Sequence, residues 1–291
     1  MRRDAVIRRI VALHAPGLRA EIREKRALRY GTDPGSASGI ASHVRAASAI
    51  RRHGSRLIVI QDDVNALAVM DASSCIMPLL LPPGADGRRS FDRTLGNKHL
   101  KMDLEAAVVL PDGRVLVFGS GSARARETIV VVESETGVRV RRAPGLYARL
   151  RKHCEIVGTE LNIEGVVIQG PRLRLFQRGN GARVIGGRSG SLVFDVDLAQ
   201  LLRWLAGRGP VPNVTDVLEV DLGTIDGVPF GFTDAAVRLA RRHGRARHGR
   251  DRVGWTCDSA QARRNRAATR IDQGVRCRGR HGSAGPSGLA G

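Results

Sequence analysis

A strand–turn–strand pattern recurs along this chain and limits it to a small set of folds. Two copies are clear: residues 103–122 place two apolar runs around Pro111-Asp112-Gly113, and residues 162–180 place two more around Gly170-Pro171. A third copy has its first strand at residues 37–42 and its second at 56–65, and a fourth begins near Thr233. Runs rich in Val and Ile between Gly- and Pro-containing turns are typical of β-hairpins. The repeat therefore predicts an all-β protein.

Each unit extends to four strands. In the second unit, residues 128–132 and 138–141 supply the third and fourth strands, and in the third unit residues 191–196 and 217–222 do so. Helices are expected only at residues 147–153 and 198–206. Four-stranded sheets repeated along a chain favour a β-propeller-like fold, in which each blade buries its faces against its neighbours. The alternative is a β-sandwich of unrelated strands.

The aligned first strands carry acidic residues at one position. The matched residues are Ser38, Glu105, Glu164 and Asp234. The first strands of a propeller line its central channel, so the three acidic residues are predicted to converge there. Carboxylates that converge repel one another unless a proton or a cation lies among them. Because oxygen ligands suit Ca²⁺ or Mg²⁺, we predict a metal at Glu105, Glu164 and Asp234.

The same acidic positions suggest a catalytic role. A metal held there could polarise a phosphoryl or carbonyl oxygen and activate water. Glu105 and Glu164 are accordingly predicted to be catalytic as well as metal-binding. The alternative is a structural role, in which each carboxylate accepts hydrogen bonds from backbone amides of the neighbouring blade.

Basic residues lie close to these strands in the sequence. Lys98, His99 and Lys101 precede the strand of Glu105, and Arg178 follows the second strand of the third unit. The cations Lys98, Lys101 and Arg178 are predicted to bind a small anionic substrate, and His99 to act as a general acid or base. The alternatives are a solvated loop at 98–101 and a simple turn after Arg178. In the first unit, the place that matches Arg178 holds the polar residues Asp62, Asp63 and Asn65.

Positive charge is concentrated at the end of the chain. The formal net charge is +20, and residues 238–291, with fourteen arginines and three aspartates, carry more than half of it. No strand or helix period persists there, so we divide the chain into a propeller domain at 1–237 and a basic tail at 238–291. The tail is either disordered and able to bind nucleic-acid phosphates or the product of a shifted reading frame. We favour the second interpretation, so nucleic acid is not an expected partner.

Cysteine usage and hydropathy bear on location. The four cysteines show no C-x-x-C spacing and are too sparse for a disulfide scaffold, which favours a reducing cytoplasm. No segment approaches the roughly 18 apolar residues of a membrane span, so no membrane partner is expected.

The run at residues 5–11, which Arg8 and Arg9 interrupt, is a strand candidate that could complete a last blade. The oligomeric state stays open.

Four segments together resemble an uncharacterised family of bacterial propeller proteins. They are Asn97-Lys-His-Leu-Lys-Met-Asp-Leu-Glu105, Leu161-Asn-Ile-Glu-Gly165, Phe176-Gln-Arg-Gly-Asn-Gly181 and Asp221-Leu-Gly-Thr-Ile-Asp-Gly-Val-Pro-Phe-Gly-Phe-Thr-Asp234. That family is distantly similar to the esterase-like phytases and related propeller hydrolases, in which an acidic residue followed by a small one opens the inner strands. The resemblance covers about residues 35–237. It implies five or six blades, of which the last are missing from this chain.

Three classes of function stay open at this point. The first is a metal-dependent hydrolase of phosphoesters or carboxylic esters at the central channel, and the second is a non-catalytic propeller that binds a ligand or a protein. The third is nucleic-acid binding through the basic tail. The sequence has no G-x-S-x-G, H-E-x-x-H or P-loop motif, and Gly119-Ser-Gly-Ser122 lacks the helix and Lys of a phosphate-binding loop.

Overall fold

Short apolar runs joined by tight turns build four sheets in the computed structural model. It describes residues 7–13, 21–31, 39–134, 137–179, 190–238 and 252–259, with Arg238 and 252–259 described as backbone only. The first sheet contains, in chain order, β2 (Ala47–His53), β3 (Arg56–Gln61), β4 (Ala66–Met70) and β5 (Ile76–Leu80). The second contains β6 (Leu104–Val109), β7 (Val115–Gly119), β8 (Thr128–Val132) and β9 (Val138–Arg142).

The third and fourth sheets depart from four strands. In the third, β10 (Ile163–Gln169), β11 (Arg172–Gln177), β12 (Ser191–Asp197) and β13 (Val214–Asp221) follow one another, and β1 (Ile7–Val11) pairs in parallel with β13. The fourth joins β14 (Thr224–Ile225), β15 (Val228–Arg238) and β16 (Arg252–Ser259). The N-terminal strand candidate is thus confirmed, but it joins the third blade.

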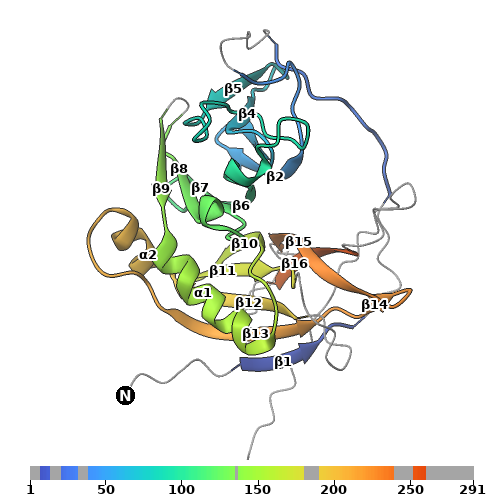
Figure 1. Cartoon of the computed structure of the whole chain (residues 1–291), viewed down its shortest axis with the longest axis vertical. Coiled ribbons are helices and arrows are strands. Elements are labelled where there is room, and N and C mark those ends of the chain that lie inside the picture. The colour runs from blue at the N-terminus through green and yellow to red at the C-terminus, as the bar shows by residue number, and fades with distance from the viewer. Residues whose placement is uncertain are drawn as a thin grey trace, which may run out of the picture.

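The four sheets are arranged as blades around a common centre (Figure 1). Their first strands meet there, since β6 contacts both β2 and β10, and β10 contacts β15. Gly165 allows the last of these contacts, because a Cβ at this position would lie 2.9 Å from the backbone nitrogen of Ala235. The all-β, propeller-like repeat is therefore confirmed.

Apolar clusters fill the spaces between neighbouring blades. Leu67 and Val117 belong to the cluster between the first and second blades, and Phe176 and Phe232 to that between the third and fourth. The largest cluster lies between the second and third blades, where helices cover it. Each blade is thereby buried on the faces it turns to its neighbours.

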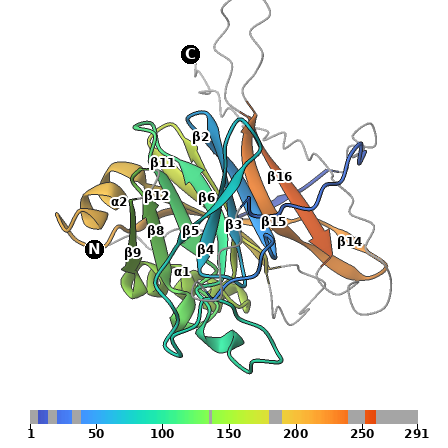
Figure 2. The same ribbon diagram turned by 90° about the horizontal axis from the view of Figure 1, so that it is seen from above.

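Two α-helices cover this largest cluster, α1 (Pro144–Val157) and α2 (Leu198–Leu205). Proline in the first turn begins α1, and Gly158 in the left-handed conformation ends it. The Asp197 side chain caps α2 by accepting a hydrogen bond from the backbone nitrogen of Gln200. Both helices were predicted, and in the described part of the chain neither is long and apolar enough to cross a membrane. They lie on the opposite side of the molecule from β14 (Figure 2).

Two features of the fold differ from the sequence interpretation or extend it. The first strand of the first blade is Ala47–His53, which reaches β3 through the tight turn at Gly54-Ser55, and not the segment at 37–42. At the other end, β16 lies beyond residue 237 and pairs with β15, so part of the expected tail continues the fourth sheet. The reading-frame interpretation and the boundary at 237 stay predictions.

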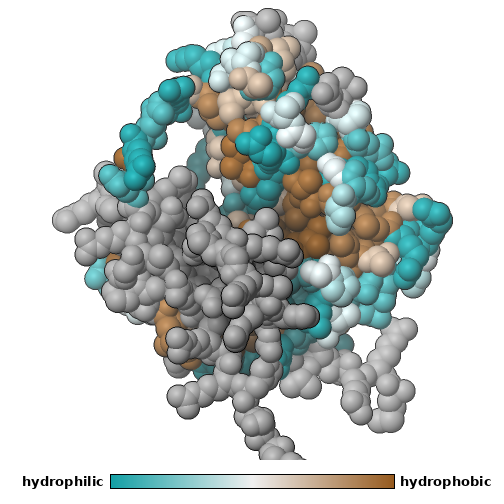
Figure 3. Space-filling model, turned by 180° about the vertical axis from the view of Figure 1, so that it is seen from behind, coloured by the Kyte–Doolittle hydropathy of each residue, from teal (hydrophilic) through white to brown (hydrophobic). Residues whose placement is uncertain are grey.

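From behind, the surface shows an apolar area beside hydrophilic ones (Figure 3).

Candidate functional site

A β-bulge interrupts each first strand, near the beginning of β2, β6 and β10 and in the middle of β15. Pairing with the neighbouring strand skips Ser48, Glu105, Glu164 and Thr233 in the four blades in turn. A bulge leaves one residue unpaired and redirects its side chain, so the structure marks one such position in each first strand. The sequence alignment placed Ser38 and Asp234 in the first and fourth of them. Asp234 directly follows the bulged Thr233, and Ser38 lies outside the described residues.

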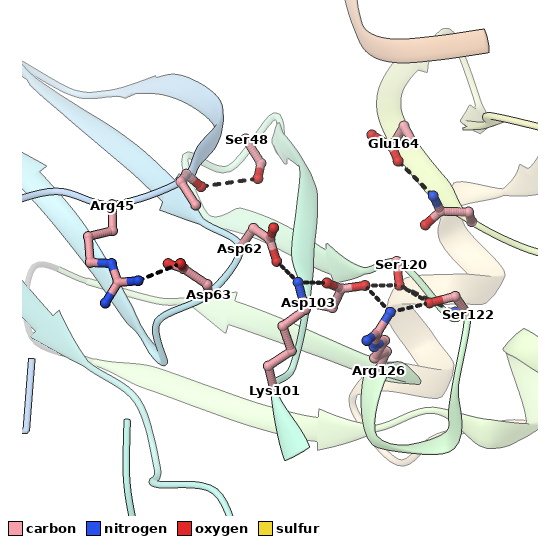
Figure 4. A network of polar contacts seen from close by, with 12 residues as sticks. Arg45, Ser48, Asp62, Asp63, Lys101, Asp103, Ser120, Ser122, Arg126 and Glu164 are labelled. Carbon is pink, nitrogen blue, oxygen red and sulfur yellow. Dashed lines mark hydrogen bonds and ion pairs between the residues drawn. The ribbon is translucent and has the colours of Figure 1, made fainter. Parts of the chain in front are cut away.

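The bulges lie at one end of the centre. Because β2 to β13 pair with their neighbours in antiparallel fashion, each first strand begins beside the end of the second. Residues that follow a second strand, such as Asp62, Ser120 and Arg178, therefore lie at the same end as Asp103, which precedes β6. Figure 4 shows Asp62, Asp103 and Ser120 in one network of polar contacts.

Three carboxylates and one ammonium form the middle of this network. Oxygen atoms of Asp62, Asp103 and Glu105 all lie within 4.8 Å of one another. The Nζ atom of Lys101 forms ion pairs with both Asp62 and Asp103, and the Lys101 side chain is only 9% exposed. A buried ammonium thus offsets the repulsion between two of the carboxylates.

Asp62 and Asp103 have pKa values that move in opposite directions. Burial raises the pKa of Asp62 to about 6, and a hydrogen bond with Asp103 adds to this against the charge of Lys101. Burial also acts to raise the pKa of Asp103, but the Lys101 ammonium and hydrogen bonds from Asp62, Lys101 and Ser120 hold it below its usual value. The pair therefore combines a carboxylate that stays ionised with a carboxyl that holds a proton more strongly.

The two bulged glutamates are both held towards the protonated form. Burial raises the pKa of Glu164 to about 8, although Arg178 pairs with it at 2.9 Å and opposes the shift. Burial also raises the pKa of Glu105, and the charges of Glu164, Asp62 and Asp103 add to the effect. Among the described residues Glu105 forms no ion pair, which leaves it the least compensated carboxyl of the site.

The predicted site residues fall into two groups. Lys101, Glu105, Glu164 and Arg178 lie together at the network. Lys98 and His99 are exposed on η2 (Lys98–Leu100), a short 3₁₀ helix, as the alternative of a solvated loop expected. Asp234 pairs with Arg51 at 2.8 Å and is not part of the group formed by Asp62, Asp103 and Glu105.

The sequence prediction left Asp62, Asp103, Ser120 and Arg126 out of the site. Asp62 was noted only as the counterpart of Arg178 in the first blade. A usable signal existed for Asp103, because it directly precedes a first strand and lies two residues before the bulged Glu105. Ser120 and Arg126 reach Asp103 only through the fold, from the loop after β7.

Comparison with known proteins gives a family and distant structural likenesses. Residues 43–242 match the model of a family of unknown function, DUF6929. No curated protein matches the chain. A selenomethionine-substituted virginiamycin B lyase from Staphylococcus aureus aligns with 12% identity and a TM-score of 0.31, over 60% of this chain and 42% of that one. A streptogramin B lyase aligns with 10% identity and a TM-score of 0.32, over 60% and 41%. The chain thus spans about two fifths of the length of these structures.

Proposed function

The chain belongs to the family of unknown function DUF6929, and we propose that it is a hydrolase of phosphoesters or carboxylic esters that acts at the centre of the blades. One observation carries the proposal: carboxyl groups with opposite pKa shifts share one end of the centre with three basic side chains. Pairs of titratable groups whose pKa values are pushed apart are typical of general acid–base catalysis.

The residues of the site suggest a division of roles. Asp103, whose pKa is held low, would accept a proton, and Glu164, whose pKa is raised to about 8, would donate one to the leaving group. Lys101 and Arg126 would stabilise negative charge on the substrate. A small anionic ester is therefore the proposed substrate class, and a reducing cytoplasm the proposed location.

A divalent cation is a separable part of the proposal. The oxygen atoms of Asp62, Asp103 and Glu105 form the kind of ligand set that Ca²⁺ and Mg²⁺ prefer. Lys101 already neutralises Asp62 and Asp103, so a cation would bind through Glu105 and displace the ammonium. A bound cation would supply Lewis acidity towards a phosphoryl or carbonyl oxygen.

Turnover of p-nitrophenyl phosphate and p-nitrophenyl acetate, with and without Ca²⁺, Mg²⁺ or a chelator, tests the proposal. Glu164→Gln, which removes the proposed proton donor, should lower the rate by about 10²-fold or more, which is the range of general acid–base catalysis. Glu105→Gln should remove any dependence of the rate on the added cation. Glu133→Gln, at an exposed surface pair with Arg139, is the matched control and should leave the rate unchanged. Absence of turnover by the wild-type protein, together with no bound metal on elemental analysis, would reject the hydrolase.

A second candidate is a non-catalytic ligand-binding protein. It is favoured by the pairing of Asp62, Asp103 and Glu164 with cations, since compensated carboxylates also occur in purely structural networks. A thermal-shift screen of small anions separates the two candidates. A binder shows a raised melting temperature with a compound that the protein does not turn over.

A further inference from the structure

The loop after β7 is folded tightly against the site. A Cβ at Gly119 would lie 2.2 Å from the carbonyl oxygen of Arg126 and 2.8 Å from that of Met102, so only glycine permits this path. The hydroxyl of Tyr147 donates to the carbonyl oxygen of Gly119 at 2.8 Å and fixes the loop from the helix side. Ser120, which follows directly, is brought to the carboxylate of Asp103.

Two serines in this loop link the buried carboxylate to the surface. Ser120 Oγ donates to Asp103 Oδ2, and Ser122 Oγ lies 2.9 Å from Ser120 Oγ. Ser120 is completely buried, whereas Ser122 is exposed. Arg126 Nη1 donates to Ser122 Oγ at 2.7 Å and also pairs with Asp103 at 2.9 Å (Figure 4).

The direction of these hydrogen bonds follows from counting protons. Asp103 pairs with Lys101 and Arg126 and is therefore an ionised carboxylate that can only accept. The single proton of the Ser120 hydroxyl points to Asp103, so Ser120 must accept the proton of Ser122 at its own oxygen. The Ser122 hydroxyl thus donates inward while Arg126 donates to it, which leaves its remaining lone pair available to the solvent side.

We infer that Ser122 is the nucleophile of this protein towards small anionic esters, with Ser120 and Asp103 as its proton relay. The inference rests on the proposed hydrolase function. A serine hydroxyl is a weak nucleophile unless a base takes its proton, and Ser120 connects Ser122 to such a base. Arg126 supplies a fixed positive charge beside the oxygen on which negative charge develops.

The step balances in protons and bonds. Ser122 Oγ forms a bond to the phosphorus or the acyl carbon, its proton moves to Ser120, and the proton of Ser120 moves to Asp103. The ester bond breaks, and the leaving alkoxide takes the proton of Glu164. Water then attacks the covalent intermediate and gives a proton back to Glu164, the acid is released with its proton, and Ser122 departs as an alkoxide that regains its hydroxyl proton from Asp103 through Ser120.

Labelling of the full-length protein with a fluorophosphonate tests the inference, because this reagent forms a stable adduct with an activated serine. Peptide mass spectrometry should locate the adduct on Ser122. Ser122→Ala should abolish labelling, and Ser120→Ala should slow it by at least tenfold. Ser73→Ala is the matched control, because Ser73 is also exposed and donates to a carboxylate, that of Asp71, at 2.7 Å. Since Ser122 is exposed, an unchanged melting temperature of Ser122→Ala will show that the variant folds.

The outcomes separate this inference from the hydrolase itself. Turnover of the p-nitrophenyl esters by wild type and by Ser122→Ala at equal rates, with no adduct on Ser122, would overturn the nucleophile and leave the hydrolase standing. An adduct on Ser122 without ester turnover would support its activation and reject the hydrolase. Equal labelling of Ser122 and Ser73 would overturn the inference, since it would show ordinary surface reactivity.

Discussion

Lys101 determines how closely the carboxyl groups of the site can approach one another. Its ammonium contacts Asp62 and Asp103 from within the protein, where charges are weakly screened. Lys98, three residues earlier, belongs to the same basic segment but is exposed to solvent. The two lysines therefore differ in burial and partners, although they look alike in the sequence.

Replacing Lys101 by Met should destabilise the protein strongly. The substitution removes the cation that, among the described residues, contacts both Asp62 and Asp103, and it leaves a half-buried and a buried carboxylate to repel each other. Loss of one partner from a buried ion pair costs about 3–5 kcal/mol of unfolding free energy. Urea denaturation measures it, with Lys98→Met as the control expected within about 0.5 kcal/mol of wild type. Equal effects of the two substitutions would contradict the central place given to Lys101.

Glu164 should make the stability of the protein depend on pH. Its pKa is raised to about 8 from an ordinary 4.5, so between these values the folded state binds the proton more tightly than the unfolded state. This contribution to stability is complete below about pH 4.5 and is lost as the pH rises through about 8. Asp62, raised to about 6, acts in the same direction, and Asp103, whose pKa is lowered, acts in the opposite one.

Glu164→Gln isolates this effect, because glutamine resembles the protonated acid and does not titrate. Denaturation of wild type between pH 5 and 8.5 should give a falling unfolding free energy, and the variant should show a shallower fall. Glu133→Gln, at the surface, should follow the wild-type curve. Parallel curves for wild type and Glu164→Gln would mean that Glu164 is ionised throughout.

Single residues also show the limits of sequence prediction. Glu105 and Glu164 could be placed at the centre because each stands at the start of a recognisable strand pattern. Ser48 could not, because the alignment took the first strand of this blade from residues 37–42 and not from Ala47–His53. Thr233 could not, because its bulge shows only in the pairing of β15 with β16. The contact of Ser120 with Asp103 joins two loops of one blade and is set by the path of the backbone at Gly119, which the sequence pattern does not reveal.

Among the elements, β1 shows that a local apolar pattern can predict a strand without predicting the strand with which it pairs. Its apolar residues predict a strand, but its parallel partner β13 lies about 200 residues away in the sequence. Ile7 packs against the cluster between the second and third blades, and Ile10 against the cluster between the third and fourth. The strand thus covers the edge of β13 and contributes to two apolar clusters. Pairing of this kind depends on the completed third blade, so the sequence alone could predict the strand but not its place.

Substitution of both Ile7 and Ile10 by Ala should weaken the third blade. Each residue is partly buried, so we expect a loss of about 1–2 kcal/mol of unfolding free energy per site, below the range for fully buried isoleucines. Hydrogen exchange should become faster in β13 than in β11, because β13 loses its protecting neighbour. Val11→Ala is the control, since Val11 is 62% exposed. Unchanged exchange in β13 would show that β1 adds nothing to the blade.

For the molecule as a whole, the contact between the first and fourth blades decides whether the blades enclose the centre. Arg51 of β2 provides this contact. Its Nε donates to the carbonyl oxygen of Ala107 in the second blade at 2.6 Å. Its Nη2 donates to two oxygens of the fourth blade, Oδ1 of Asp234 at 2.8 Å and the carbonyl oxygen of Ala235 at 3.1 Å. One side chain therefore joins three blades. Asp234, expected from the sequence to bind a metal, is engaged in this link.

Arg51→Met should release the fourth blade from the first while leaving the apolar clusters between the other blades intact. Removal of charge-assisted hydrogen bonds that are partly exposed should cost about 1–3 kcal/mol of unfolding free energy. The result specific to this link is faster hydrogen exchange in β15, with exchange in β7 and β12 unchanged. Asp234→Asn should also speed exchange in β15, but by less. Arg52→Met, at the exposed neighbouring position, is the control. If β15 exchanges at the wild-type rate in Arg51→Met, the packing of Phe232 and Ala235 against the third blade is sufficient to hold the fourth blade, and the Arg51 link is not what closes the centre.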